Sequence, residues 1–77
     1  MAFERARYAE ALDYARRAVK LSPRSSKYLI LVGDAYFKLV RYAEAQAAYE
    51  KARALAPRNE VVESRLLSLR GKLRTDR

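Results

Sequence analysis

The chain has 77 residues, which is enough for one domain. Apolar residues make up 51% of it and charged residues 34%, the balance of a folded globular protein rather than a disordered one. With no Cys, no His and only two Gly, it offers no thiol nucleophile, no imidazole base, no usual zinc ligands, no disulfide and no glycine-rich phosphate loop. We therefore expect no enzyme, no cofactor and no metal.

Positive charge is the second compositional feature. The 17 Lys and Arg residues exceed the 9 Asp and Glu residues, for a formal net charge of +8, and this favours acidic partners such as nucleic acid or an acidic protein surface. The cations are spread from Arg5 to Arg77 and form no run of like charges. A generally basic, solvated surface is the simpler interpretation, and nucleic-acid binding is the alternative.

No segment of the sequence resembles a membrane or export signal. The apolar run from Tyr28 to Gly33 is far shorter than the roughly 20 residues that span a bilayer. The N-terminal segment lacks the apolar core of a secretory signal, and Glu4, Glu10 and Asp13 are unlike an acid-poor transit peptide. We expect no membrane insertion and a cytoplasmic protein.

Helix-forming residues dominate the chain, and Pro23 and Pro57 mark its clearest breaks because a proline ends a helix before itself. The pattern predicts four helices, over about residues 2–21, 26–39, 42–55 and 60–74. Ser25 or Ser26 is placed to cap the second helix, and Asn59 is placed to cap the fourth.

The first predicted helix has two apolar stripes. One joins Tyr8, Leu12, Ala15 and Val19, and the other joins Ala11, Ala15 and Ala18. No earlier helix in this sequence covers the second stripe, and its small side chains allow another helix to come close. We therefore expect a self-association face made of Ala11, Tyr14, Ala15 and Ala18.

The other helices differ in how much of their surface is apolar. The second is apolar over most of its circumference, which is typical of a helix between two neighbours. In the third, Gln46 and Arg53 replace the Leu12 and Val19 of the first. The fourth is apolar on one side only and basic over much of the rest, which is typical of a terminal lid. Its stripe comprises Val62, Leu66, Leu69 and Leu73.

The two prolines are 34 residues apart, and this interval is an internal repeat. Residues 7–23 and 41–57 align without a gap, and eight of the 17 positions are identical. The joint between the second and third helices, at residues 40–42, contains neither Gly nor Pro and is inferred from this repeat. The identical pairs are Arg7/Arg41, Tyr8/Tyr42, Ala9/Ala43, Glu10/Glu44, Ala11/Ala45, Ala18/Ala52, Leu21/Leu55 and Pro23/Pro57.

Bulky, small and aromatic residues recur between Ser26 and Pro57 at Leu29, Val32, Gly33, Tyr36, Ala45, Tyr49, Ala52 and Pro57. In this order and with this period the segment resembles a tetratricopeptide repeat. The resemblance implies an all-α fold, a four-helix antiparallel right-handed α-solenoid. Within it, residues 1–23 would supply the second helix of a truncated repeat, residues 24–57 a complete repeat, and residues 58–77 a capping helix and tail.

The resemblance also implies a function. Members of the family bind peptides and protein segments in a groove lined by the first helix of each repeat. We therefore expect a non-enzymatic scaffold that contacts a protein or peptide and stacks on itself or on upstream repeats. The Lys and Asn carboxylate clamp of chaperone-binding members is not expected, because Ile30 and Asp34 stand at its helix positions. The expected groove residues are Lys27, Ile30, Asp34, Phe37, Lys38, Arg65, Ser68 and Lys72. The open alternative is that Phe37 folds against a neighbour and the charges are plain surface.

Overall fold

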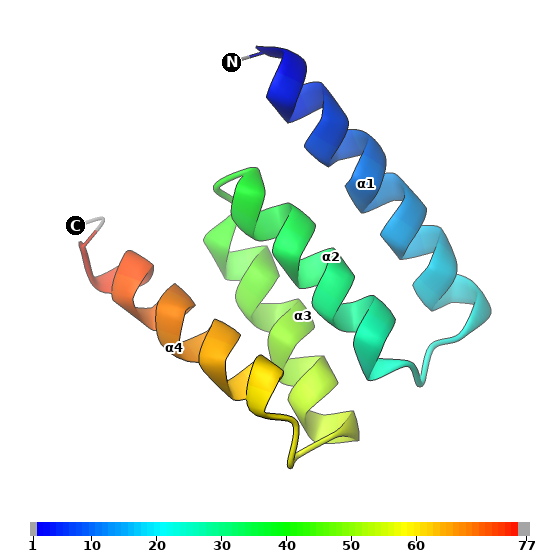
Figure 1. Ribbon diagram of the computed structural model, residues 1–77, viewed down its shortest axis with the longest axis vertical. Helices are drawn as coiled ribbons and strands as arrows, with labels where there is room; N and C mark the ends of the chain where they lie inside the picture. The colour runs from blue at the N-terminus through cyan, green and yellow to red at the C-terminus, as the bar shows by residue number, and fades with distance from the viewer. Residues whose placement is uncertain (1, 76–77) are drawn as a thin grey trace.

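The computed structural model describes residues 2–75, which form four consecutive helices: α1 (Ala2–Leu21), α2 (Ser26–Lys38), α3 (Tyr42–Leu55) and α4 (Glu60–Thr75). Each helix runs antiparallel to the next, and the four lie side by side in chain order (Figure 1). The described part of the chain contains no strand. The predicted all-α class is confirmed, and every helix boundary lies within one residue of its predicted position.

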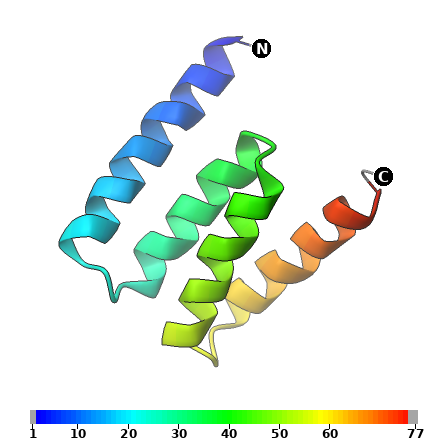
Figure 2. The ribbon, with the colours of Figure 1, turned by 180° about the vertical axis from the view of Figure 1, so that it is seen from behind.

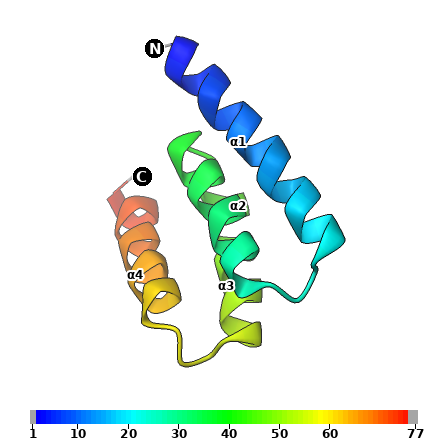
Figure 3. The same cartoon turned by 45° about the vertical axis from the view of Figure 1, so that its right-hand side comes forward.

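The stack is thin, with principal extents of 33 × 29 × 15 Å. Seen from behind and from the side, α1 and α4 form its two opposite edges (Figures 2 and 3). The main contacts join α1 to α2, α2 to α3 and α3 to α4. Each edge helix therefore packs mainly against one neighbour, whereas α2 and α3 are held from both sides.

The 34-residue repeat is visible in the helix boundaries. The starts of α2 and α4 are 34 residues apart, and so are the ends of α1 and α3. The caps repeat as well: the Ser25 hydroxyl accepts from the Tyr28 amide at 3.3 Å, and Asn59 Oδ1 accepts from the Val61 amide at 2.9 Å. Of the two serines considered for the second helix, Ser25 is the cap.

Small side chains dominate the core and let the helices approach one another closely. One close approach is at Gly33, where a Cβ atom would lie only 2.5 Å from Cε1 of the fully buried Tyr49 ring. Gly33 therefore removes side-chain bulk where α2 and α3 cross. The buried clusters are Leu12, Ala15, Val32, Ala35 and Ala48; Leu29, Ala52 and Val62; and Ala45, Tyr49 and Leu69.

The turn between α2 and α3 ends the helix without glycine or proline. The Arg41 amide donates to the Tyr36 carbonyl at 2.9 Å, and the Val40 amide donates to the Phe37 carbonyl at 3.0 Å. This pair of bonds is a Schellman motif, in which the residue before the last, here Val40, adopts the left-handed conformation. Val40 has a φ of 63° there, a conformation in which a β-branched side chain is strained.

Val40→Gly is therefore expected to raise the free energy of unfolding by about 1 kcal/mol. Relief of the left-handed strain is worth about 1–2 kcal/mol, and the greater freedom of glycine in the unfolded chain offsets part of it. Urea denaturation followed by circular dichroism measures the change. Val61→Gly is the control, since Val61 is similarly exposed but helical and its replacement should destabilise slightly. A lower midpoint for Val40→Gly would contradict the assignment of strain.

Candidate protein-interaction surface

An open hollow of about 330 Å³ lies between α2 and α4, with Tyr49 of α3 beneath it. The two helices that border the hollow, α2 and α4, each begin after a capping side chain, Ser25 and Asn59 respectively. Its lining mixes aromatic, basic and hydroxyl groups. The lining residues are Asp34, Phe37, Lys38, Tyr49, Arg65 and Ser68.

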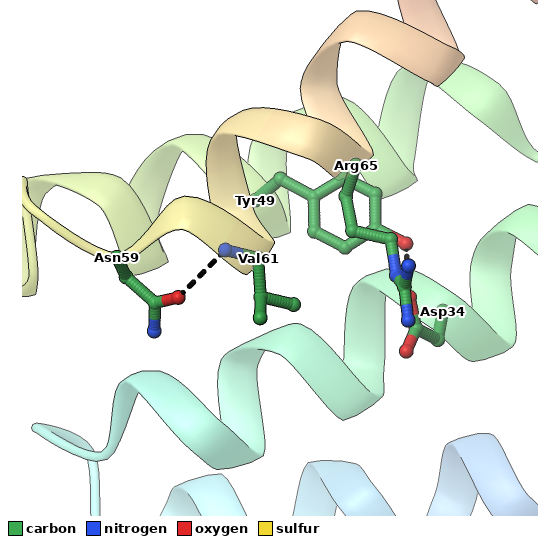
Figure 4. A network of polar contacts seen from close by, with 5 residues as sticks. All are labelled: Asp34, Tyr49, Asn59, Val61 and Arg65. Carbon is green, nitrogen blue, oxygen red and sulfur yellow. Dashed lines mark hydrogen bonds and ion pairs between the residues drawn. The ribbon is translucent and has the colours of Figure 1, made fainter.

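A polar network of three side chains connects the helices around this hollow (Figure 4). The Tyr49 hydroxyl donates a hydrogen bond to Asp34 Oδ1, and Arg65 Nε donates to the same oxygen at 3.0 Å. Burial, reinforced by the hydrogen bond to the Asp34 carboxylate, raises the pKa of Tyr49 well above its ordinary value. Tyr49 therefore keeps its proton and remains a donor, and Asp34 Oδ1 accepts from two helices at once.

The network sets the charge of the hollow. The Arg65 guanidinium compensates the Asp34 carboxylate, while the exposed Lys38 adds a positive charge at the rim. Both members of the Asp34–Arg65 ion pair are partly open to water, so the pair contributes modestly to stability. The hollow therefore has a mildly basic rim.

Five of the predicted groove residues, Asp34, Phe37, Lys38, Arg65 and Ser68, line this hollow together. The other three lie elsewhere. Ile30 is half-buried and packs against two of the core clusters, and Lys27 and Lys72 are exposed outside the lining.

The ring of Phe37 lies 5.3 Å from the ring of Tyr42 and packs on the core. Phe37 thus folds against a neighbour, as the alternative interpretation had it, while one side still borders the hollow. Its aromatic surface is only partly available to a partner.

The predicted self-association face on α1 is mostly exposed. Tyr14 is 79% exposed, Ala11 is exposed and Ala18 is half-buried. Ala15 differs from the prediction of an open contact residue, because it is only 6% exposed and packs inside the chain against Val32 and Ala35. It lies on both apolar stripes, and α2 already covers it.

Large apolar side chains that the prediction did not include are also exposed on α1 and α2. Leu21, on α1, is 87% exposed, and Leu31, on α2, is 46% exposed. The sequence did not indicate that either residue is exposed. Leu21 was noted only as an identical position in the repeat alignment, and Leu31 lies within the apolar run from Tyr28 to Gly33.

The geometry now described is a pair of helices that begins at residue 26, crosses at Gly33 and Tyr49, and closes at Pro57. A family model described as the tetratricopeptide repeat matches residues 26–59. This segment is a tetratricopeptide repeat. Helix α2 is therefore the first helix of the repeat, and α3 is the second.

Curated proteins related to the chain support the same assignment. The small glutamine-rich tetratricopeptide repeat-containing protein 2 of Mycosarcoma maydis is 36% identical over 63 residues, covering 82% of this chain and 18% of that protein. Intraflagellar transport protein 70A of Homo sapiens is 42% identical over 55 residues, covering 71% of this chain and 8% of that protein. The chain thus spans less than a fifth of the length of these relatives.

The tetratricopeptide repeat family is generally a scaffold for protein–protein contacts and is typically not catalytic. Within residues 2–75, no three acidic side chains come together in a way that could hold a metal ion. None of the four helices described here combines the length and the apolar character needed to cross a bilayer.

The Tyr49–Asp34–Arg65 network was not foreseen from the sequence. The sequence indicated Asp34 only as an expected groove residue that stands at a clamp position of the family. Its partners are 15 and 31 residues away in the chain, so no local spacing pattern could reveal them. The repeat register was the one available signal, since it places Asp34 and Arg65 on the first helices of successive hairpins.

Proposed function

We propose that this chain is a non-enzymatic interaction module that stacks, through α1, on another helical hairpin and presents the hollow between α2 and α4 to a peptide. Residues 1–23 act as the second helix of a repeat whose first helix comes from outside them. Residues 24–57 are the complete repeat, and residues 58–77 are the cap and tail.

The observation that carries this proposal is the exposed apolar surface on α1. Tyr14 and Leu21 are 79% and 87% exposed, on the flank of α1 that also carries Ala11 and Ala18. Large side chains left open beside small ones are typical of a contact site. Covering them removes apolar area from water, which is worth about 25 cal/mol per Å² before the entropy of association is subtracted.

Multi-angle light scattering over a dilution series tests this proposal. We expect the isolated chain to form a dimer or larger oligomer at tens of micromolar. Tyr14→Glu should abolish this association by placing a charge in the contact. Ala9→Glu is the matched control, because Ala9 is exposed on the other flank of the same helix and its replacement changes the charge equally. A monomeric wild type, or equal association of both variants, would contradict the proposal.

Nucleic-acid binding, suggested by the charge of +8, is the weaker candidate. Binding without sequence preference combines a basic groove with aromatic rings open to stacking. Here Tyr49 is fully buried, Tyr36 packs against the core, and the Tyr42 ring packs at a tilt against Phe37. Binding to single-stranded RNA that survives physiological salt would reverse this ranking.

A further inference from the structure

Within residues 2–75, the two edge helices, α1 and α4, are halves of a repeat that have no hairpin partner. With a shift of 34 residues, α1 corresponds to α3 and is a second helix without its first, while α4 corresponds to α2 and is a first helix without its second. They lie at opposite edges of the stack (Figures 1 and 3). We propose that α4 of one copy pairs with α1 of the next, so that a complete hairpin forms between two molecules of this chain, head to tail. The inference rests on the proposed stacking through α1 and names the partner.

Side-chain sizes at the crossing point fit this pairing. Within the chain, Gly33 on the first helix leaves room for the Tyr49 ring on the second. The corresponding residues, 34 positions later and earlier, are Leu67 on α4 and Ala15 on α1. The large and small partners are thus exchanged between the helices. In the proposed pairing Leu67, which is 66% exposed, lies opposite the small Ala15, which is itself 6% exposed beside α2.

Tyr14 has an equally specific place in this pairing. Its counterpart inside the chain is Ala48, which packs against Val32 and Ala35. The counterparts of those two residues are Leu66 and Leu69. These leucines line a small groove of about 80 Å³ between α3 and α4. The exposed Tyr14 ring of the next copy therefore covers this groove.

Charge also favours an α4–α1 contact. Glu44 and Tyr36 line one groove inside the chain, and their counterparts between copies are Glu10 on α1 and Arg70 on α4. An acid and a base thus face each other where the chain itself has an acid and a tyrosine. The pair favours this orientation over contacts between two basic surfaces.

The helix lengths are compatible with two unlinked halves. Inside the chain, residues 39–41 leave the helix to make the turn from α2 to α3. The corresponding residues 73–75 of α4 and 5–7 of α1 are helical. Both edge helices therefore run straight through the positions where a covalent hairpin must turn.

Complementation of two variants tests the head-to-tail arrangement. Tyr14→Glu disables the α1 edge and Leu67→Glu disables the α4 edge, and both side chains are exposed, so both variants should fold. Each variant alone is expected to be monomeric by light scattering at the concentration where the wild type associates. A one-to-one mixture is expected to have twice the monomer mass, because the intact α4 of the first variant meets the intact α1 of the second.

The double variant Tyr14→Glu/Leu67→Glu is the control, since it should remain monomeric alone. Circular dichroism checks each fold, and serine at both positions repeats the experiment if either glutamate variant is unfolded. If Leu67→Glu associates like the wild type while Tyr14→Glu does not, the contact joins two α1 faces: the head-to-tail inference is overturned and the proposed function stands. A mixture that stays monomeric also overturns the inference. A monomeric wild type overturns both.

Discussion

Gly33→Ala is expected to destabilise the chain by about 2 kcal/mol, although alanine is the better helix former. A Cβ atom at residue 33 would lie 2.5 Å from Cε1 and 2.7 Å from Cδ1 of Tyr49. That ring is fully buried and cannot move aside, because its hydroxyl is fixed on Asp34. Overpacking of this kind costs about 3 kcal/mol, and the gain in helix propensity returns about 1 kcal/mol.

The other glycine of the chain provides the matched control. Gly71 also lies inside a helix, but a Cβ atom there meets no heavy atom within 4 Å. Gly71→Ala should therefore stabilise the protein by about 1 kcal/mol. Thermal and urea unfolding of both variants, at low protein concentration to limit self-association, measures the two changes. If both substitutions shift stability in the same direction, the close contact between α2 and Tyr49 does not constrain the fold.

Leu69→Ala is expected to cost about 3 kcal/mol and to loosen α4 from the stack. Leu69 is 1% exposed and packs in a buried cluster with Ala45 and Tyr49. Removal of a buried leucine side chain leaves a cavity and typically costs about 2–5 kcal/mol. A chain of this size has a total stability of only about 4–12 kcal/mol, so the loss is a large part of the whole.

The same substitution at Leu67, two residues away, separates an effect on stability from an effect on association. Leu67 is 66% exposed on the same helix, and Leu67→Ala should change the stability of the dilute protein by less than about 0.5 kcal/mol. Chemical denaturation of both variants provides the comparison. A loss at Leu67 equal to that at Leu69 would show that α4 is docked through a different face.

Much of the fold could be predicted because its signals are local. Pro23 and Pro57, with the caps at Ser25 and Asn59, define the hairpins without any knowledge of packing. The turn at Val40 was inferable only from the repeat, since backbone hydrogen bonds rather than a special residue end α2.

The candidate site was harder to predict because it depends on contacts between distant residues. The sequence placed Ala15 on two stripes at once, and only the packing of α2 decides between them. Ile30 and Phe37 have the spacing of groove residues, yet neighbouring side chains partly cover both. Helical periodicity identifies a face of a helix but does not show which neighbour reaches that face first.

The order of contacts along the stack also governs how the molecule comes apart. Helices touch mainly their sequence neighbours, so opening can begin at either edge and leave the central pair in place, as in other linear repeat arrays. Local contacts of this kind also shorten the search for the native state. The chain should therefore assemble quickly around α2 and α3, fray first at its two ends, and show amide exchange that is slowest in the middle of the stack.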